Sequence, residues 1–166
     1  MKTFRTFIDC VPPTTTAQQH KRIFKTRDGR AFLGTDAKGN RVQAELYALL
    51  SAHVPPQDFP RDVPLTVSIE FAFPYRKSEK KRVIREKRVI PHASRPDVDN
   101  LVKFLLDCMT RTHFWNDDGQ VFSLSLRKVY SAEPGIGIRI DAVDETDSWT
   151  LDGNDRAAEQ KELELQ

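Results

Sequence analysis

Two pairs of aspartates near the middle of the chain have the residue type and spacing of a metal site. Asp97 and Asp99 stand either side of a valine in SRPDVDNLVKFLLD, residues 94–107. Asp117 and Asp118 are adjacent in the later segment WNDDGQV. Clustered carboxylates without a histidine or cysteine partner favour a hard cation, Mg²⁺ with Mn²⁺ as a substitute. Such ions assist the hydrolysis of phosphodiesters, so the acids indicate chemistry on phosphate.

The backbone around the first pair decides whether its two acids can share an ion. Side chains two residues apart lie on one face of an extended chain but not of a helix. If the two acids are to share an ion, residues 97–99 must therefore be extended and the helix must start near Asp99, and its apolar spacing runs from Asn100 to about Arg111. Pro96 favours this arrangement because it keeps the preceding residue out of helical geometry. Lys103, one turn into the helix, could neutralise the acids or contact a phosphate.

A third carboxylate must come from the second pair. After the helix the chain turns at NDDG into a strand, and this return brings Asp117 or Asp118 beside the first pair only if the helix and strand ends align. Each acid also has an ordinary structural explanation. Asp97 and Asp99 could cap the helix, Asp117 and Asp118 could belong to a turn, and Asp99 could form an exposed pair with Lys103.

The remaining sequence supplies the elements that must position these acids. Residues 63–73 alternate apolar and polar side chains and predict the clearest strand. Asp28-Gly29 is a dipeptide typical of hairpin turns, so residues 22–34 predict a hairpin. In the basic connector 76–88, Ser78 could cap a short helix. The other predicted elements are a strand at 3–11, a helix at 37–53 and strands at 120–130 and 133–141. This order predicts an α+β fold, a single domain with a mixed β-sheet and two main helices packed on it.

Charge is distributed unevenly along the 166 residues. Residues 141–166 hold nine of the 24 acids and two of the 26 bases, which leaves 15 acids and 24 bases in residues 1–140. We expect a domain at 1–141 that attracts polyanions and an acidic tail at 142–166, flexible or weakly helical. The candidate DNA-contacting residues are Lys21, Arg22, Lys25, Arg27 and Arg30 on the hairpin and Lys80, Lys81 and Arg82 on the connector.

Composition excludes several classes of protein. No apolar run approaches the roughly 20 residues that cross a bilayer, so no membrane association is expected. The two cysteines, Cys10 and Cys108, form neither a disulfide framework nor a metal motif, and this favours a reducing environment. The N-terminal residues lack the apolar segment of a signal peptide. The expected location is cytoplasmic, in a bacterium or a phage-infected cell.

The composite string RPDVDNLVKFLLDCMTRTHFWNDDGQV, residues 95–121, resembles the RusA family of Holliday-junction resolvases. The family signature joins a P-D-x-D-N-x-x-K helix entrance to a W-x-D-D-x-Q-V strand start, and a weaker likeness covers most of residues 1–140. The resemblance implies a homodimeric, Mg²⁺-dependent endonuclease of DNA recombination and repair. Its implied substrate is a four-way DNA junction, in which it nicks two opposing strands.

Carried over to this sequence, the family's catalytic carboxylates fall on Asp97, Asp99 and Asp118, and its functional lysine falls on Lys103. Asp117 takes the adjacent acidic position with a less defined role. Two other functions stay open at this point. One is a less selective nuclease for flaps, forks or other branched DNA, and the other is a DNA-binding module without catalytic activity.

Overall fold

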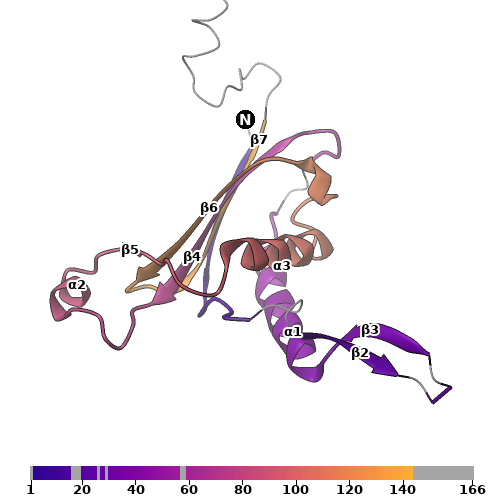
Figure 1. Cartoon of the computed structure of the whole chain (residues 1–166). Coiled ribbons are helices and arrows are strands. Elements are labelled where there is room, and N and C mark those ends of the chain that lie inside the picture. The colour runs from indigo at the N-terminus through magenta and orange to yellow at the C-terminus, as the bar shows by residue number, and fades with distance from the viewer. Residues whose placement is uncertain (1, 16–19, 26, 29, 57–58, 144–166) are drawn as a thin grey trace, which may run out of the picture.

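The computed structural model describes residues 2–15, 20–25, 27–28, 30–56 and 59–143. Its main sheet has five strands in the order β1-β7-β4-β6-β5 (Figure 1). β4 pairs parallel with β6, and all other neighbours in this sheet are antiparallel. The strands are β1 (Thr3–Asp9), β4 (Leu65–Pro74), β5 (Ile90–Pro91), β6 (Val121–Ser131) and β7 (Gly135–Ala142). With its helices, this mixed sheet confirms the predicted α+β class.

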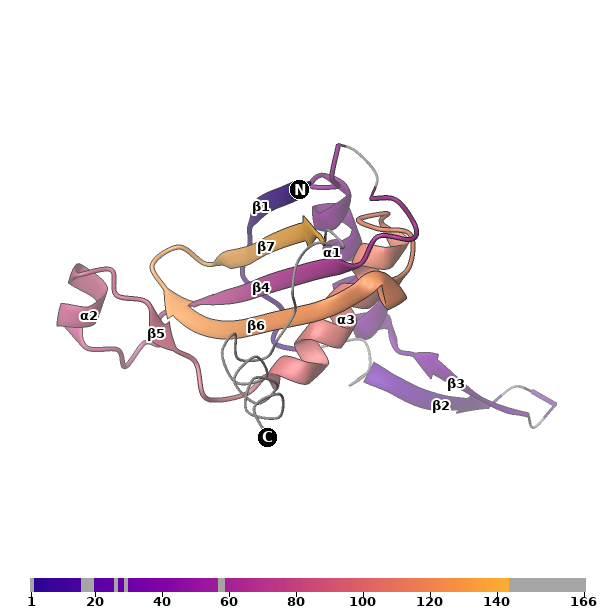
Figure 2. The same ribbon diagram turned by 90° about the horizontal axis from the view of Figure 1, so that it is seen from above.

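The two main helices, α1 (Ala37–Ser51) and α3 (Val98–Arg111), lie on the same face of the sheet (Figures 1 and 2). β4 lies at the centre and turns Leu65, Val67 and Ile69 toward the helices, while the residues between them face the opposite side. The predicted alternation is therefore confirmed. Arg111 extends from α3 to donate a hydrogen bond to the Tyr47 hydroxyl of α1 at 2.9 Å, which links the two helices at their surface.

α3 is an amphipathic helix whose apolar face is fully buried. Leu101, Leu105 and Cys108 are among the residues that it contributes to the core. Burial raises the pKa of the Cys108 thiol to about 12, so this cysteine is a core residue and not a reactive one. The helix starts near Asp99 as expected, but the extended backbone required over residues 97–99 is not found, because Val98 and Asp99 already belong to the helix. Asp97 is the N-cap residue, and only this acid has extended backbone.

Two basic elements project from the main sheet at different ends of the molecule (Figures 1 and 2). One is the antiparallel hairpin of β2 (Lys21–Lys25) and β3 (Ala31–Thr35), which forms a separate two-stranded sheet. The other is the connector, which contains the short helix α2 (Lys81–Arg85). Lys80 occupies the N-cap of α2, so the suggestion that Ser78 caps it is wrong.

Two expectations lie outside the described residues, namely the Gly29 position of the hairpin turn and residues 144–166 of the acidic tail. Within the described ranges, no helix is both long and apolar enough to cross a membrane.

Candidate metal and nuclease site

Asp97 and Asp99 line one open pocket of about 800 Å³ at the N-terminal end of α3. Its opposite wall is the middle of β6, where Leu126, Arg127 and Lys128 lie, and residues 92–95 close one end. Although Asp99 is helical, both acids thus face the same cavity. An open pocket that contains two carboxylates is a suitable place for a cation and a phosphate.

The Asp97 carboxylate takes no part in capping the helix. Asp97 has the extended backbone of an N-cap residue, with φ −72° and ψ 138°, but its side chain accepts no cap hydrogen bond. The expectation that it could be a simple helix cap is therefore wrong for the side chain. Its oxygens remain available to a ligand at the N-terminus of a helix, where a phosphate is also favoured.

Lys128 holds the segment that leads to Asp97. Its ammonium group donates to the backbone carbonyl oxygens of Ser94 and Pro96, which are the third residue and the first residue before Asp97. Burial lowers the pKa of Lys128, and the charge of Asp97 acts in the opposite direction. Lys128 therefore contributes positive charge to the pocket and fixes the backbone at its entrance.

His92 anchors the same segment from the other side. Its ring stacks on Tyr130 with ring centroids 4.1 Å apart, and the Phe73 ring lies 4.8 Å away. Its Nδ1 accepts a hydrogen bond from the Ser94 backbone N–H at 3.3 Å. Burial, followed by the nearby Lys128 charge, lowers the pKa of His92. This histidine is a packing residue.

Asp117 has a structural role that the sequence left open. It caps the short 3-10 helix Asp118–Gln120, and its Oδ1 accepts a hydrogen bond from the Gly119 N–H at 2.7 Å. Gln120 completes a capping box through its side chain. The same side chain donates to the carbonyl oxygens of Pro60 and Val63, at 2.8 and 3.1 Å, which ties the turn to the preceding loop.

Asp118, in contrast, is exposed at the opposite end of α3 from the first pair. The turn that carries it follows the C-terminus of this helix, where Trp115 Nε1 donates to Thr110 Oγ1 at 2.8 Å. A helix of 14 residues is about 21 Å long, so roughly that distance separates Asp118 from Asp97. Among the described residues, no three acidic, histidine or cysteine side chains form a group that could hold a metal. One copy of the chain therefore does not bring the three expected carboxylates together.

Lys103 lies on the exposed side of α3. It does not line the pocket of Asp97 and Asp99, and the described ion pairs do not join it to Asp99. The lysine that the structure places at the acids is thus Lys128, which sequence reasoning missed. A lysine within an alternating strand carries no local signal, because its position opposite residues 94–96 is set by the sheet.

The basic candidates occupy both projections. Lys21, Lys25 and Arg27 are exposed on the hairpin, while Arg22 pairs with Asp36 at 3.1 Å and Arg30 with Asp28 at 3.5 Å. On the connector, Lys80 and Lys81 are exposed and Arg82 pairs with Glu86 at 2.8 Å. The hairpin and the connector that carry these residues lie at different ends of the molecule (Figure 1).

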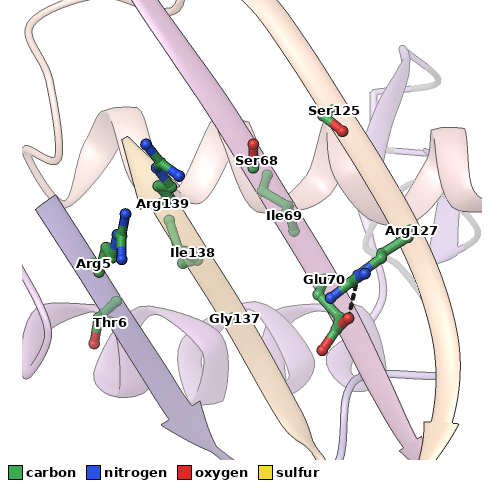
Figure 3. A pocket seen from close by; sticks show the side chains of 10 residues that line it. All are labelled: Arg5, Thr6, Ser68, Ile69, Glu70, Ser125, Arg127, Gly137, Ile138 and Arg139. Carbon is green, nitrogen blue, oxygen red and sulfur yellow. Dashed lines mark ion pairs between the residues drawn. The ribbon is translucent and has the colours of Figure 1, made fainter. Parts of the chain in front are cut away.

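A second pocket, of about 460 Å³, lies on the face of the sheet that the helices leave open (Figure 3). Arg5 and Arg139 stand on neighbouring strands there, and Arg127 forms an ion pair with Glu70. This pocket contains none of the four aspartates. The pocket of Asp97 and Asp99 is therefore the candidate site.

Comparison with known proteins agrees with the motif. The family model described as Endodeoxyribonuclease RusA matches residues 11–141. A protein of Lactococcus phage r1t, named Crossover junction endodeoxyribonuclease rusA, is 35% identical over 128 residues, or 77% of this chain and 90% of that protein. YqaN of Bacillus subtilis (strain 168), an uncharacterized protein, is 28% identical over 138 residues, or 80% of this chain and 96% of its own length. The chain therefore belongs to the RusA family of endodeoxyribonucleases, as its sequence predicts.

Proposed function

We propose that this protein is a Mg²⁺-dependent endonuclease that acts as a homodimer on four-way DNA junctions in recombination and repair. The observation that carries the proposal is the pair of carboxylates in the open pocket, one of which stands at a helix N-terminus without capping it. The name of the Lactococcus phage relative, a crossover junction endodeoxyribonuclease, supports the choice of substrate.

The residues at the pocket fit a magnesium ion. Mg²⁺ is typically held by one or two carboxylates, and water and substrate phosphate oxygens complete its coordination. Asp97 and Asp99 provide two such carboxylates, and the pocket is open to a phosphate. When bound, the ion would lower the pKa of a coordinated water and offset negative charge on the phosphate.

The position of Asp118 explains why the proposed nuclease site would need two copies of the chain. If this third carboxylate belongs to the same site, it must come from a second copy, because about 21 Å separates the two ends of α3. In a two-fold dimer, an arrangement that brings the partner's Asp118 to the pocket of one protomer does the same for the other. Two equivalent sites would result, as symmetric nicking of a junction requires.

The basic side chains of this protein then have separate roles. Lys128 fixes the backbone before Asp97 and supplies positive charge close to the scissile phosphate. Lys103, on the exposed side of α3, would contact a neighbouring phosphate of the DNA. The hairpin and the connector provide phosphate contacts on either side of the sheet, which recognise the backbone and not the bases.

Comparing substrates tests this function directly. With Mg²⁺ present, we expect the protein to nick a four-way junction symmetrically and to leave a linear duplex of the same sequence intact. A gel assay with each strand labelled in turn measures both reactions. Equal cleavage of flaps and forks would favour the less selective nuclease, and no cleavage of any DNA with Mg²⁺ or Mn²⁺ would favour the binding module.

Replacing Lys128 tests the role of the structurally identified lysine. Lys128→Met should reduce junction nicking by about 10- to 100-fold, the range found when groups that support metal ligands are removed. The loss should shrink as Mg²⁺ is raised, because a loosened Asp97 segment weakens ion binding first. Lys38→Met, which removes an exposed lysine from α1, serves as the matched control. A Lys128→Met enzyme with an unchanged Mg²⁺ dependence would contradict the assignment.

A further inference from the structure

We propose that the β2-β3 hairpin packs an apolar pair, Ile23 and Leu33, against a base pair at the branch point of a DNA junction. The inference rests on the proposed function and names a contact that distinguishes branched from linear DNA. Ile23 is 72% exposed and Leu33 is 65% exposed. They are the two most exposed large apolar side chains in the described part of the chain.

The two side chains form one apolar patch on one face of the hairpin. Ile23 and Leu33 are directly opposite each other in the antiparallel register. The Cβ atoms of such a pair are about 4.5–5.5 Å apart, so the side chains touch. A two-stranded hairpin has little stability of its own in water, and exposed apolar surface of this kind indicates a binding site. The patch is therefore a surface that another molecule would cover.

The charge around the patch favours DNA as the molecule that covers it. Lys21 and Lys25 share the face of Ile23, because side chains two residues apart on a strand point the same way. Both lysines are exposed, and their Cα atoms are about 13 Å apart along the strand. Residues 21–35 hold five bases and one acid, which attract a polyanion. An apolar patch between two cations fits a base-pair face with phosphates on either side.

The base of the hairpin is fixed to α1, so the patch is held in a defined place. Asp36 caps α1 by accepting a hydrogen bond from the Gly39 N–H at 2.9 Å. The same carboxylate accepts a hydrogen bond from Arg22 Nε of β2 at 3.1 Å. The Asp36 N–H donates to the His20 carbonyl oxygen at 3.0 Å, which closes the hairpin where it meets the helix. The ribbon beyond these contacts projects from the molecule (Figures 1 and 2).

A branch point is the part of the DNA that such a patch can contact. Within a duplex arm each base-pair face is covered by its neighbour, and an apolar wedge must unstack the bases to reach it. Stacking is interrupted where four arms meet, so a base-pair face can be covered there at lower cost. Ile23 and Leu33 form no hydrogen bonds with base edges, so this contact reads no sequence. It adds selectivity for branched DNA to the phosphate contacts of the hairpin.

Replacing the apolar pair tests this contact. The Ile23→Thr/Leu33→Thr variant keeps every charge of the hairpin, and threonine is well suited to strands. Its affinity for a four-way junction should fall by about tenfold, the order of loss for one base contact, while its affinity for a linear duplex should be unchanged. Mobility shifts without divalent ions measure both affinities. Val11→Thr, at a 64% exposed apolar position outside the hairpin, is the matched control and should bind both DNAs normally.

Permanganate oxidation tests whether the patch covers a base. This reagent attacks the exposed face of thymine, so a junction with thymines at the branch point is oxidised there. Saturating wild-type protein should protect these thymines, and saturating Ile23→Thr/Leu33→Thr protein should not. The Ile23→Val/Leu33→Val variant keeps an apolar surface and should protect them as the wild type does. Thermal unfolding verifies that each variant is folded.

The lysines provide a contrast with the apolar pair. Lys21→Met/Lys25→Met should weaken the binding of junction and duplex by equal factors and reduce the salt dependence of both, because these side chains are assigned to phosphates. A selective loss of junction binding in this variant, with none in Ile23→Thr/Leu33→Thr, would overturn the role given to the apolar pair. The same mobility shifts at several salt concentrations measure these effects.

The outcomes separate this contact from the proposed function. Selective junction binding and thymine protection by a protein that cuts no DNA would support the contact and contradict the function. A junction nuclease whose Ile23→Thr/Leu33→Thr variant binds and protects the junction as the wild type does would keep the function and overturn the contact. A variant with altered sedimentation and unchanged DNA binding would assign the patch to a protein contact instead.

Discussion

An Asp99→Asn substitution is expected to reduce junction cleavage by more than about 100-fold, the upper loss seen when only the supporting partners of metal ligands are removed. Asn has nearly the same size, and Asp99 is exposed on the first turn of α3, so the fold should be retained. The loss follows because a neutral amide replaces one of two anionic ligands in the pocket. Single-turnover nicking with Mg²⁺ measures it.

Junction binding by the same variant should be unchanged, because affinity for DNA is assigned to the basic projections. A mobility shift without divalent ions measures this binding. Asp107→Asn provides the matched control, since Asp107 is another exposed acid on α3, two turns further along the helix and outside the pocket. Full cleavage by Asp99→Asn, or an equal loss in Asp107→Asn, would rule out the role given to Asp99.

An Asp118→Asn substitution should reduce cleavage as strongly as Asp99→Asn does, although Asp118 lies about 21 Å from that pocket within one chain. Its neighbour provides the control. Asp117 acts as a cap, and Asn is an equally good cap, so Asp117→Asn should keep both stability and cleavage. The nicking rates of the two variants at equal Mg²⁺ show which of the two aspartates the nuclease site uses. A large loss in Asp117→Asn with little in Asp118→Asn would reverse the assignment.

Local patterns were sufficient to predict most of the fold. The alternation of residues 63–73 predicts β4, and the apolar spacing after Asn100 predicts α3, because both patterns are set by burial on one side of an element. The sequence could not decide whether the backbone of Val98 and Asp99 is extended or helical, since both residues are acceptable in a first helical turn. β5 was missed because two residues, one of them proline, give no periodic signal.

The site was predictable in its residue types and only partly in its geometry. The motif identifies Asp97 and Asp99, and the structure places them in one pocket. The sequence could not reveal that Asp118 lies at the far end of α3 or that Lys128 holds the backbone before Asp97. Both facts depend on the parallel pairing of β6 with β4, which joins segments separated by more than 50 residues.

Nicking of a four-way junction by an equal mixture of Asp97→Asn and Asp118→Asn tests the central claim most directly. Each variant alone should be inactive, because every site lacks one carboxylate. If a site takes Asp97 and Asp99 from one copy and Asp118 from the other, each mixed dimer has one intact site. Subunit exchange should then restore about a quarter of the wild-type density of active sites. A mixture that exchanges subunits but stays as inactive as its components would contradict a site shared between two copies.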